Sequence, residues 1–496
     1  MSHQVNYPVF LVSAALVILL VLMGVLYTET LEQIINIVNE GINTYFGWFL
    51  ILSVSIFLVF VIYIMFSRYG NVRLSPDDSK PRYSFFVWLA MLFSAGMGIG
   101  LLFYGVAEPM MHYADPPPIV EGETQEAARL AMDFSFLHWG LHAWATYIII
   151  GLSVAYFSYR RGYPLSIKYI FYPVFGNRIY GPVGHTIEIL AIIGTLFGVA
   201  TSLGLGAMQI NAGLDYLFGI EPSTFVQIVL IGVITLIALA SVASGVNRGI
   251  KWLSVFNVNV GAFLLLFVII VGPTIFILQA FLQNIGNFLD NFITLSLWNQ
   301  AFVKTDVDWQ SAWTIFYWSW WIAWSPYVGI FIARISKGRT IKEFIAGVLF
   351  IPTLFSFLWL TAFGSTGIFF EMENEVGIIS AIQEEIESGL YVFLEQFPLS
   401  TIISVLATIV IVSFFVTSSD SGSLVIGMIA SGGASDPPLL QRIFWAIIQG
   451  SVAAVLLLGG GLLALQTAAI SMGLPFAAVL LILCYSLYKE LKTEDT

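Results

Sequence analysis

Aromatic side chains are dense in residues 313–329, which read WTIFYWSWWIAWSPYVG. This uncharged stretch holds five tryptophans and two tyrosines, and helical spacing places Tyr317, Trp321 and Trp324 on one face. Ring quadrupoles attract a desolvated cation by up to about 2 kcal/mol or more for each contact. The stretch therefore predicts a cage for a cation without hydrogen-bond donors, such as a quaternary ammonium group. A membrane-interface belt or ordinary core packing is the alternative.

A second aromatic patch, HWGLHAWATY, occupies residues 138–147, where Trp139, Trp144 and Tyr147 fan across one broad helical face. His138 and His142 have the i,i+4 spacing of metal ligands. No acidic residue lies between them and no cysteine is near, so we expect structural histidines with hydrogen-bond partners instead.

Gly96, Gly98 and Gly100 interrupt a long apolar stretch. Glycines at alternate positions can unwind a helix and expose backbone N–H and C=O groups at mid-membrane depth. Such a break persists only where it lines a cavity or is buried in protein. The alternative is close helix packing by small residues, because Gly96 and Gly100 also have GxxxG spacing.

The composition places these motifs in a membrane. Of the 496 residues, 58% are hydrophobic and 10% are charged, with a mean hydropathy of +0.89, whereas soluble domains carry about 25% charged residues. We therefore expect an all-α membrane protein that is embedded in the lipid membrane. We expect no nucleic-acid partner. The single cysteine, Cys484, excludes disulfides and cysteine-based metal clusters. Few titratable residues fall at mid-membrane depth, which disfavours an embedded enzyme.

Twelve apolar segments are long enough to span a bilayer at about 20 residues each. They are 9–26, 47–66, 85–104, 136–156, 187–208, 225–243, 253–277, 313–333, 344–363, 401–428, 443–463 and 465–487. Of the 19 lysines and arginines, 17 fall on one side of these spans, and only Arg129 and Lys304 fall opposite. Basic residues mark the cytoplasmic side, so both termini are expected there.

The glycine-broken helix is the third span, and the tryptophan-rich helix, with an expected interruption at Ser325-Pro326, is the eighth. Interrupted helices five apart indicate two five-helix repeats of inverted topology, as in many transporters. The predicted organisation is two N-terminal helices (1–84), a first repeat (85–278), an amphipathic interfacial segment (279–312), a second repeat (313–487) and a short cytoplasmic tail (488–496).

Four stretches together resemble the betaine/choline/carnitine transporter family over essentially the whole chain. They are SAGMGIGLLFYGVAEP (94–109), HWGLHAWATY (138–147), FGVATSLGLGAMQI (197–210) and YWSWWIAWSPYVGIFIARISKGRTIKEF (317–344). The resemblance implies the fold of sodium-coupled inverted-repeat transporters, with two extra N-terminal helices, in a homotrimer in the cell (inner) membrane.

The resemblance also implies site residues. The aromatic box for a trimethylammonium group corresponds to Trp139, Trp144, Tyr147 and Trp321, with Trp324 on the cytoplasmic exit path. One Na⁺ site corresponds to the backbone carbonyls of Ser94, Met97 and Phe414 with the side chains of Thr417 and Ser418. A second Na⁺ site is doubtful, because Thr195 is its only hydroxyl and the other positions hold Val199 and Ala323.

These features predict a symporter that imports glycine betaine, or a similar ammonium or sulfonium zwitterion, with Na⁺. We expect the cationic head in the box and the carboxylate at backbone N–H groups exposed along 96–100. The alternatives are a sodium-independent exchanger of carnitine-like substrates, a choline transporter and an ion channel. Choline is expected to be a poor substrate because no acid lies near Gly100, and Gly100→Asp is expected to admit it.

Overall fold

The computed structural model describes residues 5–96, 98–244, 249–303 and 308–494, and every named element in these ranges is helical. The α-helices are α1 (Tyr7–Leu26), α2 (Thr28–Phe66), α3 (Phe85–Gly96), α4 (Ile99–Ala114), α5 (Gln125–Trp139), α6 (Leu141–Ala155), α7 (Tyr172–Phe175), α8 (Pro182–Phe218), α9 (Thr224–Ser244), α10 (Gly249–Val271), α11 (Thr274–Ser296), α12 (Phe316–Ile335), α13 (Ile341–Leu360), α14 (Thr366–Asn374), α15 (Ile378–Glu384), α16 (Gly389–Glu395), α17 (Ser400–Ala430) and α18 (Leu439–Leu491).

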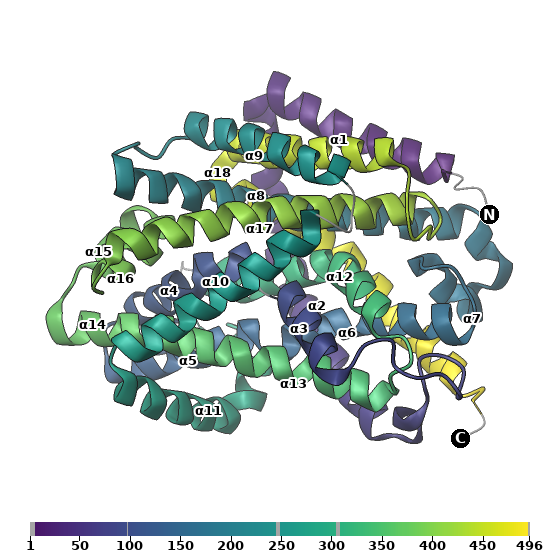
Figure 1. Ribbon diagram of the computed structural model, residues 1–496, viewed down its shortest axis with the longest axis horizontal. Coiled ribbons are helices and arrows are strands. Elements are labelled where there is room, and N and C mark those ends of the chain that lie inside the picture. Colours follow the sequence, from purple (N-terminus) through teal and green to yellow (C-terminus); the bar gives the residue numbers. More distant parts are fainter. Residues whose placement is uncertain (1–4, 97, 245–248, 304–307, 495–496) are drawn as a thin grey trace.

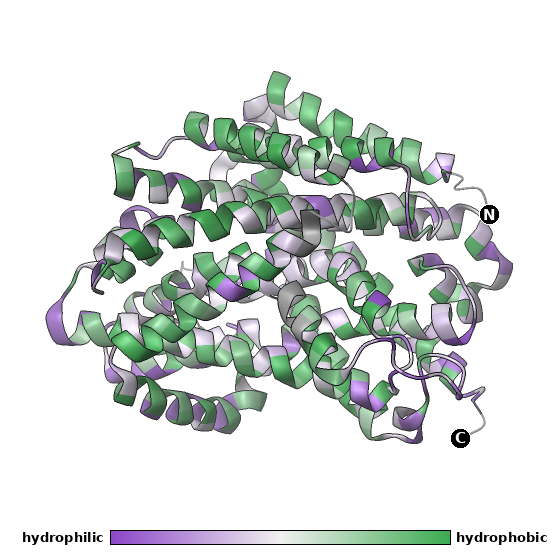
Figure 2. Ribbon diagram, viewed as in Figure 1, coloured by the Kyte–Doolittle hydropathy of each residue, from purple (hydrophilic) through white to green (hydrophobic). Residues whose placement is uncertain are grey.

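Among the described residues, nine helical stretches are long and apolar enough to cross a membrane. Hydrophobic residues follow the long helices, and hydrophilic residues gather in the connections at both ends of the bundle (Figure 2). The N- and C-termini lie at the same end as α7, and α14, α15 and α16 lie at the opposite end (Figure 1). This arrangement confirms a multi-pass, all-helical membrane protein.

Several helices extend beyond the predicted spans. Helix α2 has 39 residues, which corresponds to about 58 Å at 1.5 Å per residue and exceeds a hydrocarbon core of about 30 Å. The predicted span 47–66 is its apolar second half, and its first half carries Glu29, Glu32 and Glu40. Hydropathy marks only the apolar part of such a helix, because an amphipathic continuation is too polar to register.

The predicted break in the third span is confirmed. Helix α3 ends at Gly96, and α4 begins at Ile99 after Gly98, whose backbone is extended (φ −152°, ψ 179°). Met97 lies outside the described residues. The first N–H groups of α4 therefore lack partners within their own helix and need them from the surrounding protein or a ligand.

One other expectation about helix continuity is wrong, and one break within a predicted span was not expected. Helix α12 passes through Pro326 without interruption, because proline removes only one donor and neighbouring groups can accommodate the change. Conversely, the predicted span 136–156 is divided at Gly140 into α5 and α6. A Cβ at Gly140 would lie 2.4 Å from the carbonyl oxygen of Phe136, so only glycine fits this close turn.

The last two predicted spans share the label α18, which consists of two helices joined at a kink at Gly460 and Gly461. Gly461 has φ +59° and ψ −135°, a backbone conformation that favours glycine. The predicted amphipathic segment contains most of helix α11, which buries Ile277 and Phe288 and exposes Leu282 and Ile293. The amphipathic character of the segment and its position along a membrane interface stay predictions.

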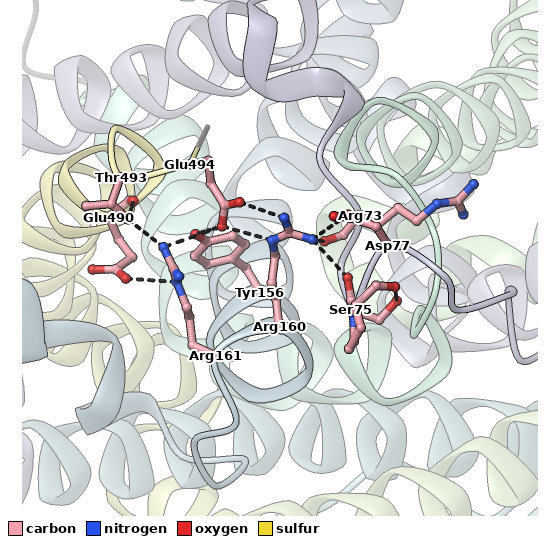
Figure 3. Close-up of polar contacts among 10 residues, drawn as sticks. Arg73, Ser75, Asp77, Tyr156, Arg160, Arg161, Glu490, Thr493 and Glu494 are labelled. Atoms are coloured by element: carbon pink, nitrogen blue, oxygen red, sulfur yellow. Dashed lines mark hydrogen bonds and ion pairs between the residues drawn. The ribbon is translucent and has the colours of Figure 1, made fainter. Parts of the chain in front are cut away.

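A cluster of charged side chains fixes the C-terminal end of α18 against the turn that follows α6 (Figure 3). Glu494 accepts hydrogen bonds from Nη2 and Nε along one edge of the Arg160 guanidinium, at 2.6 and 2.8 Å, and from the Tyr156 hydroxyl at 2.6 Å. Arg161 pairs with Glu490 at 2.9 Å. Bidentate contacts of this kind are among the stronger ion pairs.

These contacts predict a pH-dependent attachment of the C-terminal residues. Partial burial acts to raise the pKa of Glu494, but the hydrogen bonds and charges of Arg160, Tyr156 and Arg161 outweigh it, so this pKa lies below its ordinary value of 4.5. The attachment should therefore be complete above pH 4.5 and be lost as the pH falls through the lowered pKa. Hydrogen exchange of a C-terminal peptide, corrected for the intrinsic rate, would follow this loss.

At neutral pH, Glu494→Gln should raise the same exchange rate about fivefold, as expected for the loss of about 1 kcal/mol. Glu373→Gln, at an exposed glutamate of α14, is the matched control. Equal exchange in the two variants would contradict the attachment.

Candidate functional site

The predicted box residues lie in contact at the junction of α5, α6 and α12. The ring centroid of Trp321 is 5.0 Å from that of Trp139 and 6.2 Å from that of Tyr147, with near-perpendicular planes in both pairs. Trp144 lies edge-on to Tyr147 at 5.5 Å, and Trp324 lies 6.3 Å from Tyr147. All five side chains are buried, so the structure brings the whole predicted set together.

Two facing glycines let α6 and α12 approach closely enough for these contacts. A Cβ at Gly329 of α12 would lie 3.0 Å from the backbone nitrogen of Gly151 in α6. A Cβ at Gly151 would lie 3.2 Å from the carbonyl oxygen of Gly329. Tyr147 precedes Gly151 by one helical turn, so this close packing holds Tyr147 against the ring face of α12.

Two indole N–H groups of the aromatic wall on α12 donate to backbone carbonyls. Trp321 Nε1 donates to the carbonyl of His138 at 2.8 Å, and Trp320 Nε1 donates to that of Gly198 at 3.2 Å. Each of these ring edges is satisfied by protein, which leaves the ring faces for apolar or cation–π contacts.

The start of α4 packs directly on this wall. A Cβ at Gly100 would lie 2.7 Å from Cη2 of Trp320 and 3.0 Å from Cη2 of Trp139. A Cβ at Gly98 would lie 3.5 Å from Cη2 of Trp324, an ordinary contact. Trp320, which stacks on Trp321 at 4.8 Å and 15°, was not among the predicted site residues. Its position on the aromatic face of the predicted helix is the sequence feature that could have identified it as a site residue.

A buried carboxylate behind the box is a second feature that the sequence did not reveal. The Oε2 atom of Glu108 accepts hydrogen bonds from Trp139 Nε1, at 2.7 Å, and from the Tyr317 hydroxyl. Its Oε1 atom is 2.7 Å from His138 Nδ1 and 3.3 Å from His112 Nε2. Glu108 is completely buried, and its position inside an apolar stretch was the only signal.

The two histidines of the second patch behave differently from each other. His138 has the expected hydrogen-bond partners, Glu108 and the hydroxyl of Thr314 at 2.9 Å. The same expectation is wrong for His142, because neither ring nitrogen has a partner among the described residues. His142 is held by packing instead, stacked on Trp318 at 5.3 Å.

The predicted Na⁺ site can be described only on its α17 side. Thr417 Oγ1 donates to the carbonyls of Ser413 or Phe414, both at 3.1 Å, and receives a hydrogen bond from Asn257 Nδ2 at 3.2 Å. Ser418 is buried next to Thr417. The opposite ligands are Met97, which lies outside the described residues, and Ser94, of which only the position in α3 is described.

Asn257 of α10 is a residue near this site that the sequence did not indicate. Its side-chain oxygen is buried and has no hydrogen-bond partner among the described residues. In the doubtful second site the Thr195 hydroxyl is likewise buried without a partner, and Val199 and Ala323 are buried apolar residues. The second site therefore still offers a single side-chain oxygen from its predicted positions.

A cavity of about 420 Å³ lies apart from the box, between α5, α11 and the segment that ends in α14. Arg129 and Glu373 contribute charges of opposite sign to its lining. None of the predicted box residues lines this cavity. The box rings instead pack on one another and on the start of α4, so the site described here is closed by its own side chains.

Comparison with known proteins identifies the family of the chain. The sequence profile of the BCCT family, the betaine/carnitine/choline family of transporters, matches residues 8–496. The chain is 47% identical over 493 residues to an uncharacterized transporter of Mycobacterium tuberculosis, covering 98% of this chain and 83% of that protein. It is 44% identical over 486 residues to the glycine betaine transporter OpuD of Bacillus subtilis, covering 98% and 94%.

A third relative carries a different substrate name. The chain is 42% identical over 497 residues to the high-affinity choline transport protein of Escherichia coli, covering 100% of this chain and 73% of that protein. With a family profile that spans almost the whole chain, the protein belongs to the betaine/carnitine/choline family of transporters.

Proposed function

We propose that this protein is a secondary active transporter that imports glycine betaine, or a similar methylated zwitterion, together with Na⁺. The observation that carries the proposal is the meeting of Trp139, Tyr147 and Trp321 beside the interrupted start of α4. The rings suit a cation without hydrogen-bond donors, and the start of a helix suits an anion. A methylated zwitterion has both groups.

Each end of the zwitterion then has its own partner. The ammonium head contacts the faces of Trp139, Trp144, Tyr147 and Trp321. The carboxylate accepts from N–H groups in the first turn of α4, which have no partner within the helix and lie at its positive end. Gly98 and Gly100 have no side chain, so a carboxylate can approach this backbone closely.

The proposed architecture has twelve membrane crossings. Nine of these crossings are the apolar stretches described above. The other three are the interrupted pair α3 and α4, helix α12, and the second half of α18 beyond its kink. Residues 85–278 and 313–487 then form inverted repeats in a protein of the inner membrane. Both termini would be cytoplasmic, which agrees with their position at one end of the bundle (Figure 1). A homotrimer follows only from the family.

Sodium is proposed as the coupling ion, held between α3 and α17. Thr417 and Ser418 supply hydroxyl oxygens, and Asn257, with its unpartnered side-chain oxygen, supports a site that prefers hard cations. Binding there would link the helix break to α17 and so couple ion and substrate. The substrate is net neutral, so Na⁺ would carry the transported charge.

Choline is the second candidate substrate, and the structure changes the argument against it. That argument rested on the absence of an acid near Gly100, whereas the Glu108 carboxylate lies directly behind Trp139 and Tyr317. The substitution Gly100→Asp is also a poor test, because its Cβ would collide with Trp320. Uptake of labelled betaine and choline into proteoliposomes shows which substrate is transported. Comparing uptake with and without Na⁺ shows whether transport is coupled to sodium.

Replacing a box ring should weaken binding without unfolding the protein. Trp321→Leu removes one desolvated cation–π contact of about 2 kcal/mol, so betaine affinity should fall about 30-fold or more. Quenching of tryptophan fluorescence would measure this. Trp48→Leu, at an exposed tryptophan of α2, is the control for the lost fluorophore. Wild-type affinity in Trp321→Leu would show that the box is wrongly assigned.

Removing the α17 hydroxyls should weaken ion coupling. Thr417→Ala combined with Ser418→Ala should raise the Na⁺ concentration for half-maximal uptake at least about tenfold, because losing even a hydrogen-bond partner of a metal ligand commonly costs that much affinity. Ser404→Ala removes a buried hydroxyl elsewhere in α17 and serves as the control. An unchanged Na⁺ dependence would exclude this site.

The fit of α4 against the aromatic wall can be tested at two glycines. Gly100→Ala should weaken betaine binding about tenfold, because its Cβ would meet Trp320 at 2.7 Å and overpacking costs about 1–3 kcal/mol. Gly98→Ala, whose Cβ meets Trp324 at 3.5 Å, should have a smaller effect. The reverse order in direct binding assays would contradict this geometry.

A further inference from the structure

The four hydrogen-bond contacts of Glu108 identify its charge state. Trp139 Nε1 is only a donor, and a carboxylate in its ionised form is only an acceptor, with about four lone-pair positions. Glu108 has four neighbours that can donate: Trp139 and Tyr317 on Oε2, and His138 and His112 on Oε1. An ionised carboxylate can accept all four hydrogen bonds. In a protonated carboxyl group, the O–H hydrogen would point at another donor.

Neutral histidines complete this network. If His138 donates from Nδ1 to Glu108, its Nε2 is free to accept from the Thr314 hydroxyl at 2.9 Å. His112 donates from Nε2, and its Nδ1 has no partner among the described residues. Both contacts are met without a protonated ring. The cluster of Glu108, His112 and His138 then carries a net charge of −1.

This charge has no cationic partner within the described part of the protein. The only ion-pair contacts of Glu108 recorded there are with the two histidines, and all three side chains are completely buried. A buried charge without a partner is costly. A cation bound close by would offset that cost, because electrostatic attraction is stronger in a low-dielectric interior than in water.

The box is the place for such a cation. Glu108 lies one hydrogen bond behind Trp139 and Tyr317, and both rings contact Trp321, at 5.0 and 5.7 Å. A hydrogen bond to an anion also polarises the donor group, which increases the electron density of the indole. The carboxylate can therefore act on the bound head group directly and through the Trp139 ring.

We propose that Glu108 is a fixed buried anion that makes the aromatic box select a cationic head group over an uncharged one of the same shape. It acts by charge on the substrate and by hydrogen bonds on Trp139 and Tyr317. This inference rests on the proposed function, because it assumes that the box binds the substrate.

The same cluster could be read as a metal site, since one ligand atom from each of Glu108, His112 and His138 lies within 4.8 Å of the others. Hydrogen bonds already account for this arrangement. A metal ion would have to replace the N–H groups that both histidines present to Oε1. The electrostatic reading leaves every contact of Glu108 in place.

Two substitutions separate the charge of Glu108 from its shape. Glu108→Gln keeps the length of the side chain and removes the charge, and Glu108→Asp keeps the charge and shortens the side chain. If charge dominates, betaine affinity should fall about tenfold or more in Glu108→Gln and substantially less in Glu108→Asp. If Glu108 only positions the rings, Glu108→Asp should bind as weakly as Glu108→Gln or more weakly, which would overturn the proposal.

A matched ligand pair gives an independent readout. Betaine and 3,3-dimethylbutanoate differ only in whether the head group is a trimethylammonium or an uncharged tert-butyl group. In competition assays Glu108→Gln should reduce the preference for betaine over 3,3-dimethylbutanoate about tenfold. An unchanged preference would overturn the proposal, as would stoichiometric Zn²⁺ binding by the wild type that is lost in Glu108→Gln.

The controls separate this inference from the proposed function. Elution from size-exclusion chromatography in detergent checks that each variant is folded. If the wild-type protein binds neither betaine nor choline, the proposed function fails and Glu108 has no substrate to select. If the wild type binds betaine and both Glu108 variants bind it equally well, only the inference about Glu108 fails.

Discussion

The break between α3 and α4 is the constraint on which the rest of the site depends. In a membrane, backbone N–H and C=O groups outside a helix must be satisfied by protein or ligand. The break lies against the aromatic wall of α12, where Trp320 and Trp324 approach Gly100 and Gly98. A side chain at Gly100 would fill the space between the wall and the backbone. Absence of a side chain therefore keeps the first N–H groups of α4 close to the rings.

Two features of opposite polarity border the proposed site. The start of α4 presents the positive end of a helix, and the Glu108 carboxylate lies behind Trp139 and Tyr317. The ring of Trp139 lies between them, with Gly100 near one edge and Glu108 hydrogen-bonded to its Nε1. A zwitterion is complementary to this pair without any charged side chain in direct contact with it. Two relatives of the chain carry betaine or choline in their names, and both compounds have a trimethylammonium head.

Sequence patterns predicted local properties well and helix continuity less well. Hydropathy identified the long apolar helices, and alternate glycines identified the break before α4, because both signals lie within one stretch of chain. The interruption expected at Pro326 is absent, and a break at Gly140 was missed. Whether a proline or glycine breaks a helix depends on its neighbours in space. At Gly140 the deciding contact is the turn against Phe136 and the ring of Phe357.

By itself the sequence determined the membrane class and the aromatic character of the two segments that meet at the proposed site, because composition and ring density are properties of single segments. The tertiary structure alone decided what those rings contact. Glu108 and Tyr317 are 209 positions apart, and Trp321 and the carbonyl of His138 are 183 apart. No periodicity within a helix relates such positions. Their pairing follows from the packing of α4, α5 and α12, in which three of the four donors to the buried Glu108 carboxylate come from α5 and α12.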